Sequence, residues 1–541
     1  MARPFFVCRT KASLAVEKKT LKFHIVVKIS LHKNNFLIKY LRYKAVTYSK
    51  NKQRRPTMNV IALVIVGAYL IGMLLVGFIV SKTKIKTSND YMLAGRRMGL
   101  FMVAFSLSAN NIGGGSTTGL ATKAFGDWGM SACWYVLAAS VAMIPLAFFA
   151  PKIRKTLAVT IPEVVGRRFG NVSSTFTAIL NILALFCLTS SQVMASGSVV
   201  ASLTGIPLNV CLIIAGIVII LYTTLGGMIA DQISDLVQFI IILLGLAIAT
   251  PIVMNGAGGW DAISAKLPEA KLSFTAIGWV TIIGYIFNYF CTFLSGPEMV
   301  SRFESAKDEK TAKQASLVSA ILMAAMSIFP TLLGLAAFAL QDQIPGITAK
   351  TAMVDVTNHF APPLITGLIS AAIISATMSS ADSNLLCMST MFIKDIYQKF
   401  LRKTAMSDKQ TIFATRLCNV IACIIAMCIT LLGIDIVTMN TFAFAIRCAG
   451  PFAAYGLGLV VPRATKNSGI VSIIAGTVGV IFWQILSGGS FYLGLLPVVF
   501  GCLCGVLAFF IVNWIEWGKG VAPAPSAYLS DSEAAKEEAK E

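Results

Sequence analysis

Thirteen apolar stretches, each about 20 residues long or longer, dominate this sequence. A helix of roughly 20 apolar residues crosses the hydrocarbon core of a bilayer and satisfies its own backbone hydrogen bonds there. The sequence is 56% hydrophobic and only 13% charged, whereas a soluble domain carries about 25% charged residues. We therefore predict an all-α integral membrane protein with about thirteen transmembrane helices, at 59–81, 98–122, 127–151, 174–203, 207–226, 229–254, 274–300, 314–340, 363–392, 411–433, 436–461, 468–487 and 492–515.

The positive charge of the chain is concentrated before Met58. The net charge is +21, and residues 1–57 contain fifteen Lys and Arg against one acid, Glu17. Because the rest of the chain is only mildly basic, we expect no nucleic-acid partner. The leader is either a transit-type segment or translated upstream sequence with Met58 as the working start. We divide the chain into a basic extension (1–57), disordered or absent from the working protein, a transmembrane domain (58–515) and an acidic, disordered cytoplasmic tail (516–541).

Alternate loops are basic, and this pattern predicts the topology. Lys and Arg accumulate after the first, third, seventh and ninth stretches, whereas the loops at 255–273 and 341–361 are nearly balanced. Basic loops face the cytoplasm. We therefore place the protein in the cell membrane, with its N-terminus outside and its C-terminus in the cytoplasm. A basic leader would then lie on the wrong face, which favours Met58 as the start.

The second apolar stretch contains three consecutive glycines, Gly113, Gly114 and Gly115, flanked by Asn, Ser and Thr. Each glycine costs a helix about 1 kcal/mol relative to alanine, so we predict that this helix breaks within the membrane. Backbone groups freed by a break must be satisfied by protein, water or an ion, and broken helices therefore tend to line binding sites. The alternative is that the small residues only allow close helix packing.

The ninth stretch carries oxygen-bearing groups on one helical face. Ala376, Ser379, Ser380 and Ser383 follow the spacing i, i+3, i+4 and i+7. Carbonyl and hydroxyl oxygens are hard ligands that suit a monovalent cation such as Na⁺. The alternative is that these hydroxyls bond back to their own helix.

Asp382 and Arg447 are charged residues inside the ninth and eleventh stretches. A charge at such a position costs at least about 2.5–3.5 kcal/mol on insertion scales, so each needs a reason. One interpretation is a structural ion pair between the two residues. The other is that an unpaired Arg447 binds a substrate carboxylate through its planar guanidinium.

Asp231 and Asp235 form a polar face at the start of the sixth stretch, together with Gln238. Two carboxylates at i and i+4 repel each other unless a cation, a proton or a basic partner lies between them. They either line a cytoplasmic exit path or simply reach the cytoplasmic interface, after a turn at 226–227.

The seventh stretch ends in Gly296 and Pro297, a few residues after Asn288. It is a second interrupted helix, five stretches after the first, although Pro297 is equally compatible with an ordinary helix end. Two interrupted helices in corresponding positions of two halves indicate an inverted-repeat transporter with its site at the bilayer midplane.

These features resemble the sodium:solute symporter family. The resemblance rests on motifs in family order across 59–515, namely 88–96, 161–163 with 168–170, 224–238, Pro297 with Arg302, and 379–383. It implies a LeuT-like five-plus-five inverted repeat, with one extra N-terminal and two extra C-terminal helices. Stretches two to eleven would then be core helices one to ten.

The resemblance also implies site residues. It places a Na⁺ site on the backbone carbonyls of Ala109, Ile112 and Ala376 and the hydroxyls of Ser379 and Ser380. Asp235 is similar to a family aspartate linked to Na⁺ release or to a second cation.

Small residues follow the first helix break, where the sugar carriers of the family have long polar side chains. They argue against a sugar and leave room for a carboxylate at backbone amides. We therefore expect a small organic anion or amino acid, bound by Gly114, Gly115, Ser116, Asn288 and Arg447.

The predicted function is Na⁺-coupled symport of a small organic solute, such as an amino acid, a carboxylate or a vitamin, by alternating access. The expected partners are the solute, Na⁺ and the lipid bilayer, with no obligate protein partner. Coupling to H⁺ through Asp231, Asp235 or Asp382, and a transporter-like solute sensor, are the alternatives. An enzyme is disfavoured, because the chain has only three histidines and no nucleophile or cofactor motif.

Overall fold

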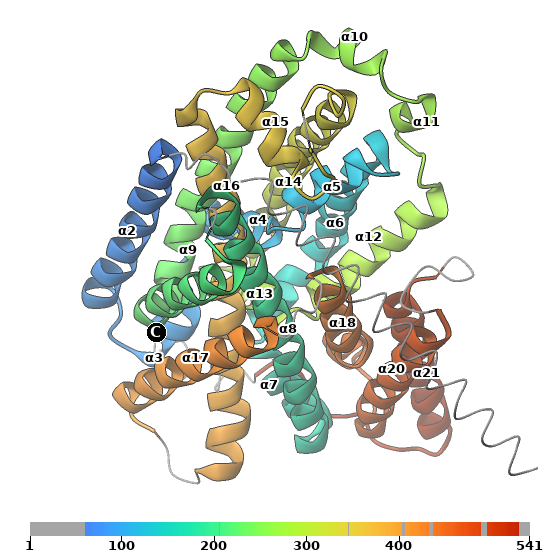
Figure 1. Cartoon of the computed structure of the whole chain (residues 1–541). Helices are drawn as coiled ribbons and strands as arrows, with labels where there is room; N and C mark the ends of the chain where they lie inside the picture. The colour runs from blue at the N-terminus through green and yellow to red at the C-terminus, as the bar shows by residue number, and fades with distance from the viewer. Residues whose placement is uncertain are drawn as a thin grey trace, which may run out of the picture. The chain divides into compact units, whose positions relative to one another are not determined.

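The computed structural model describes residues 60–529 except 205, 345, 403–405, 432–435 and 488–494. The predicted basic extension therefore lies outside the described residues. Within the described part the regular structure is helical, and the only β-type pairing is one isolated bridge between Met98 and Ala306. The all-α prediction is confirmed (Figure 1).

The first half of the bundle runs from α2 to α11. Its helices are α2 (Val60–Thr83), α3 (Ser88–Leu93), α4 (Leu100–Asn111), α5 (Thr118–Phe125), the 3-10 helix η2 (Gly129–Cys133), α6 (Trp134–Lys155), α7 (Ile161–Phe169), α8 (Asn171–Thr204), α9 (Leu208–Gly256), α10 (Gly259–Ser264) and α11 (Glu269–Leu272).

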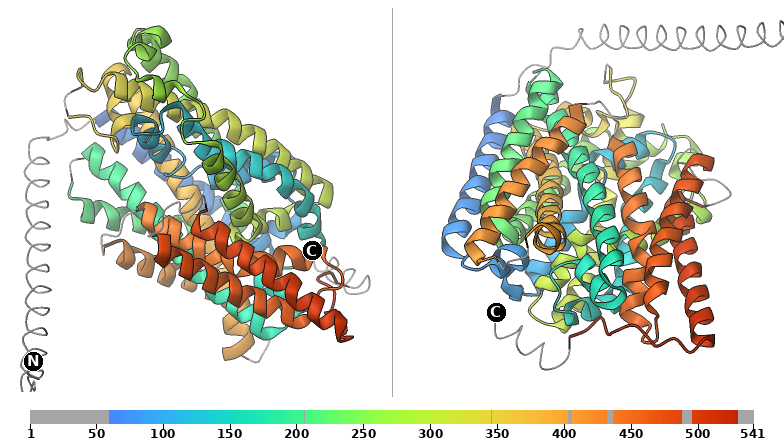
Figure 2. Two further views of the ribbon diagram at one scale, coloured as in Figure 1. Left: turned by 90° about the vertical axis from the view of Figure 1, so that its right-hand side faces the viewer. Right: turned by 90° about the horizontal axis from the view of Figure 1, so that it is seen from below.

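The second half runs from α12 to α21. Its helices are α12 (Trp279–Leu294), α13 (Pro297–Ser305), α14 (Glu309–Ala339), α15 (Ala352–Phe360), α16 (Pro363–Met391), α17 (Asp408–Leu431), α18 (Ile436–Ala449), α19 (Gly458–Val460), α20 (Lys466–Ser487) and α21 (Pro497–Gly518). Helices α20 and α21 pack against each other at the edge of the bundle (Figure 2).

Among the described residues, ten helices are long and apolar enough to cross a membrane, or eleven if the bent pair α12–α13 counts as one span. The predicted count of thirteen is not confirmed. Helix α9 contains 49 residues, a length of roughly 70 Å at about 1.5 Å per residue, which is more than twice the hydrocarbon thickness. It turns at Gly227 (φ 55°, ψ −168°) and covers the two predicted stretches 207–226 and 229–254.

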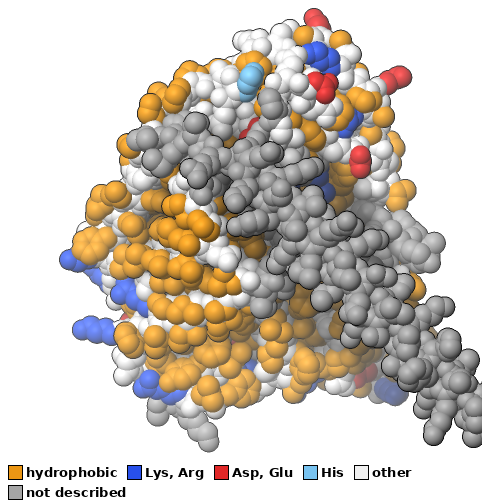
Figure 3. Space-filling model, viewed as in Figure 1, with side chains coloured by type: hydrophobic (Ala, Val, Ile, Leu, Met, Phe, Trp, Pro, Cys, Tyr) orange, Lys and Arg blue, Asp and Glu red, His pale blue; other side chains and the backbone are white. Residues whose placement is uncertain are grey.

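Large apolar side chains are exposed along the outer helices. On α2, for example, Val64, Ile71 and Ile79 are each more than half exposed. Figure 3 shows hydrophobic side chains over most of the described surface in that view. Apolar area on this scale marks contact with lipid, and the protein is a multi-pass membrane protein.

Helix α16 lies at the centre of the bundle. It packs against α2, α4, α8 and α9, and every residue from Ile369 to Met391 is buried. Its serines therefore face other helices and not lipid. This placement brings the polar stripe of α16 against the broken helix α4–α5.

The chain after α21 docks back onto the bundle as far as the described residues extend. The amide of Ala524 donates to the carbonyl of Ala464 (2.7 Å), and Tyr528 Oη donates to the carbonyl of Leu459 (2.9 Å). The expected disorder of the tail is therefore wrong for 519–529, because these contacts fix the backbone. Residues 530–541 lie outside the described part.

Candidate cation and solute site

The glycine triplet interrupts its helix as predicted. Helix α4 ends at Asn111 and α5 begins at Thr118. A Cβ atom on Gly113 would lie 3.0 Å from Ser380 Oγ, and one on Gly114 would lie 3.1 Å from the Cβ of Ala195. The glycines therefore break the helix and also admit α8 and α16 close to the break, so the two interpretations of the triplet hold together.

Ser379 and Ser380 of α16 lie against the last turn of α4. Ser379 Oγ donates to the carbonyl of Ala109 (3.0 Å), and Ser380 Oγ donates to the carbonyl of Asn110 (2.9 Å). Each hydroxyl also reaches the carbonyl of Ala376 in its own helix, at 3.2 and 3.3 Å. Oxygen atoms from two helices thus converge in a buried position.

The fifth predicted Na⁺ ligand, Ile112, directly follows the end of α4. Its amide caps that helix through the carbonyls of Ser108 and Ala109. In the described part of the chain, no group donates a hydrogen bond to its carbonyl oxygen. Backbone carbonyls at the end of a broken helix are the oxygen ligands with which such transporters hold Na⁺. The carbonyls of Ala109 and Asn110, in contact with the hydroxyls of Ser379 and Ser380, therefore fit that ion.

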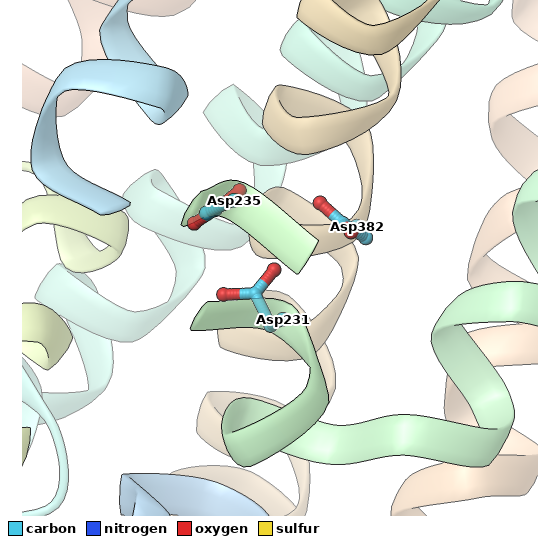
Figure 4. A group of neighbouring side chains, drawn as sticks. All are labelled: Asp231, Asp235 and Asp382. Carbon is cyan, nitrogen blue, oxygen red and sulfur yellow. The ribbon is translucent and has the colours of Figure 1, made fainter. Parts of the chain in front are cut away.

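Three carboxylates form a second polar cluster in the interior. Asp231 and Asp235 lie on successive turns of α9, beside Asp382 of α16 (Figure 4). Oxygen atoms from the three side chains all lie within 4.8 Å of one another. Asp231 is 4% exposed and Asp235 is fully buried, so the alternative that they reach the cytoplasmic interface is wrong.

Arg302 of α13 supplies the basic partner that this carboxylate spacing requires. Its Nη2 atom lies 3.0 Å from Asp231 Oδ2 and 2.8 Å from Asp235 Oδ2. Its Nε atom donates to Ser106 Oγ (2.7 Å), which donates in turn to Asp235 Oδ2 (2.5 Å). One guanidinium therefore ties α13 to α4 and α9.

The carboxylate cluster has more negative than positive charge. Asp382 accepts a hydrogen bond from the amide of Ser383 (2.8 Å). Asp382 Oδ2 and Asp235 Oδ1 have no hydrogen-bond partner among the described residues. Three buried carboxylates against Arg302 leave a charge that a second cation or a proton would compensate.

The second interruption is also confirmed. Helices α12 and α13 meet at a bend of 59°, and the side-chain amide of Asn111 at the first break lies 3.4 Å from Met299 Sδ in α13. The two breaks are therefore neighbours in space, as an inverted repeat requires.

Of the two interpretations of Arg447, the ion pair with Asp382 is wrong. Arg447 Nη1 lies 2.5 Å from Glu298 Oε1, and both side chains are buried. Glu298 stands in the first turn of α13, where the positive end of the helix dipole favours a carboxylate. The sequence signal for this pair was an acid directly after Pro297, inside an apolar stretch.

An aromatic cluster that the sequence did not predict lies beside the first break. Its four members, the aromatic box, are Trp128, Tyr135, Tyr285 and Tyr289. The ring centroids of Tyr135 lie 6.1 and 6.0 Å from those of Tyr285 and Tyr289, and Trp128 lies 5.6 Å from Tyr285. The available signal was the i, i+4 pair of tyrosines in α12.

Of the predicted solute residues, Gly114, Gly115 and Ser116 lie in the first break, and Arg447 lies beside Gly296 at the second. A Cβ on Gly115 would lie 3.2 Å from Tyr135 Oη, and Ser116 Oγ donates to the carbonyl of Asn111 (2.9 Å). Asn288 is buried in α12 next to Tyr289. The structure thus brings Gly115 and the aromatic box together, whereas Arg447 is engaged by Glu298.

Comparison with known proteins gives a family match. A model of the sodium:solute symporter family matches residues 91–476. The osmoregulated proline transporter OpuE of Bacillus subtilis is 28% identical over 490 residues, covering 87% of this chain and 97% of that protein. The sodium/proline symporter of Escherichia coli is 26% identical over 495 residues, covering 86% and 95%.

Solved structures show the same fold. A Na⁺-coupled sialic acid symporter, in a substrate-bound outward-open state, matches with a TM-score of 0.74 at 24% identity, over 86% of this chain and 98% of that chain. Mhp1, a nucleobase-cation-symport-1 family transporter, matches with a TM-score of 0.55 at 15% identity, over 84% and 99%. The predicted LeuT-like architecture is confirmed.

Proposed function

The chain belongs to the sodium:solute symporter family, and from this membership we propose that Na⁺ bound between α4 and α16 drives uptake of its solute. The protein is a Na⁺-coupled solute transporter and not an enzyme. The observation that carries the proposal is the pair of hydrogen bonds from Ser379 and Ser380 to the carbonyls at the end of α4.

The proposed Na⁺ ligands come from both sides of the interface between α4 and α16. They are the carbonyls of Ala109, Ile112 and Ala376 and the hydroxyls of Ser379 and Ser380. Na⁺ held by both helices would favour the arrangement in which they touch. An ion drives solute binding only through such a difference in affinity between two arrangements.

We propose that Asp235 takes part in the release of Na⁺ or in the binding of a second cation. Its free Oδ1 atom and the excess of carboxylates around Arg302 support a role in cation release or in binding a second cation. The same excess favours H⁺ coupling as the second candidate, because one shared proton would also relieve the repulsion.

We propose a small organic solute with a carboxylate, such as an amino acid. The proline transporters among its relatives support this class. The solute would lie between the two breaks, against the backbone of Gly114 and Gly115, with Ser116 and Asn288 beside it. The ion pair with Glu298 favours the structural interpretation of Arg447 over a solute contact.

We also propose the cell membrane as the location, with the C-terminus in the cytoplasm. The basic residues at the end of α6 and in α7 would then face the cytoplasm, as the positive-inside rule requires. The same orientation places the start of α2 outside.

The test is uptake of radiolabelled proline, lactate and pantothenate into proteoliposomes. We expect an inward Na⁺ gradient to drive accumulation of one of these solutes, and an equal K⁺ gradient to drive none. Accumulation driven by a pH gradient without Na⁺ would favour the H⁺-coupled alternative. Equal uptake with Na⁺ and K⁺ would overturn the proposed coupling.

A further inference from the structure

Lys123 is a partly buried cation without an acidic partner, close to the first helix break. It lies on α5, which begins three residues after Gly115. Its ammonium lies 3.9 Å from the ring centroid of Trp128 and 5.4 Å from that of Tyr135. In the described part of the chain it forms no ion pair and no side-chain hydrogen bond.

The other buried cations around the breaks are already paired. Arg302 contacts Asp231 and Asp235, and Arg447 contacts Glu298. Lys271, near the end of α5, donates to the backbone carbonyls of Phe125 and Gly126. Lys123 thus differs from each of them, because among the described residues its ammonium has the rings of Trp128 and Tyr135 as neighbours and no hydrogen-bond acceptor.

Tyr135 connects Lys123 to the solute region. The hydroxyl of Tyr135 faces Gly115, where a Cβ would lie only 3.2 Å away, while the Lys123 ammonium lies over the ring of the same tyrosine. Tyr285 and Tyr289 of α12 complete the aromatic box beside Tyr135. A solute lying along the break at Gly115 would therefore be separated from the Lys123 ammonium only by the side chain of Tyr135.

We propose that Lys123 binds the carboxylate of the transported solute. A carboxylate would give the ammonium the charge-assisted hydrogen bonds that it lacks. Because the faces of Trp128 and Tyr135 already hold a cation, they are not free to bind an ammonium group of the solute. This inference rests on the proposed function, and it names the chemical group by which that site selects its solute.

The test compares Lys123→Met, which keeps the length of the side chain, with Lys123→Arg, which keeps its charge. The matched control is Lys266→Met, which removes an exposed lysine five residues before Lys271. Na⁺-driven uptake of labelled proline is measured for each variant, with propionate and prolinamide as competitors. Propionate carries only the carboxylate, and prolinamide lacks it.

We expect Lys123→Met to raise KM on the order of tenfold to a hundredfold, because the solute loses one charge-assisted hydrogen bond. We expect kcat to change little, and both Lys123→Arg and Lys266→Met to stay near wild type. If propionate inhibits uptake of labelled proline, a carboxylate alone is sufficient for binding. If only unlabelled proline inhibits it, the site requires an amino acid. A KM unchanged in Lys123→Met, or prolinamide competing as well as proline, would overturn the proposal.

A binding measurement separates this inference from the proposed coupling. Tryptophan fluorescence of the purified protein is titrated with propionate and with proline in saturating Na⁺, since Trp128 adjoins Lys123. A saturable change that Lys123→Met abolishes supports the carboxylate site even if no Na⁺-driven uptake occurs. Absence of such a change in the wild type, or its persistence in Lys123→Met, overturns it.

Discussion

Arg447 and Glu298 form a buried ion pair, with Nη1 and Oε1 2.5 Å apart, that joins α18 to the first turn of α13. A Cβ on Gly296 would lie 3.4 Å from the guanidinium carbon of Arg447 and 3.0 Å from Glu298 Oε1. The pair therefore stands directly at the second helix break. Its strength depends on both partners, because a single charge left in the interior is costly.

Arg447→Gln is expected to lower the free energy of unfolding by about 3–5 kcal/mol, the cost of leaving a buried charge unpaired. The double variant Glu298→Gln with Arg447→Gln should recover most of that loss. Thermal unfolding in detergent measures both. A stable Arg447→Gln protein with a raised KM for the solute would instead assign Arg447 to solute binding.

Ser379→Ala and Ser380→Ala are each expected to raise the Na⁺ concentration that gives half-maximal uptake. The loss of one ligand oxygen worth about 0.5–1.5 kcal/mol corresponds to roughly a two- to tenfold increase. Ser370→Ala is the matched control, since this α16 hydroxyl donates only to Thr366 in its own helix. Unchanged Na⁺ dependence of uptake in both site variants would contradict the proposed Na⁺ site.

Opposite effects on stability are expected from two substitutions in the carboxylate cluster. Arg302→Gln should destabilise the protein by several kcal/mol, because Asp231 and Asp235 lose their shared partner. Asp382→Asn should stabilise the Na⁺-free protein by about 1 kcal/mol, because it removes one uncompensated charge. Thermal unfolding in choline chloride and in NaCl measures both, and destabilisation by Asp382→Asn in choline would contradict the charge excess.

Gly227→Ala is expected to prevent normal folding of α9. The residue has φ 55° and ψ −168°, a conformation that essentially only glycine adopts, and a Cβ would lie 2.6 Å from Tyr91 Cδ2. Gly72→Ala on α2 is the control, because nothing lies within 4 Å of its Cβ position, and it should stabilise by up to about 1 kcal/mol. Size-exclusion chromatography of detergent extracts gives the yield of folded protein; normal yield of Gly227→Ala would contradict this.

The sequence was most informative where local spacing decides the outcome. The break at the glycine triplet and the stripe of Ser379 and Ser380 follow from helix periodicity and backbone cost, and both are present in the structure. The number of membrane spans could not be predicted from the apolar stretches alone, because α9 joins two of them at Gly227 without a loop. Helices α4 and α5 are each too short to cross the membrane alone.

Pairings between distant helices could not be read from the sequence. Asp382 and Arg447 were the two conspicuous charges of their stretches, yet Arg447 pairs with a residue 149 positions away and Asp382 lies among other acids. Which charges meet depends on helix rotation and crossing, which a single sequence does not specify. For the same reason the aromatic box and Lys123 became visible only in three dimensions.

The contact between Arg168 and the segment after α21 has a practical consequence. Arg168 of α7 donates to the carbonyls of Pro462 (3.1 Å) and Pro525 (3.0 Å). Ending the chain after Trp517 would therefore remove the hydrogen bond between α7 and Pro525, together with the contacts of Ala524 and Tyr528 with the bundle. Affinity tags and fluorescent reporters are better appended beyond Leu529, where they leave this anchorage intact.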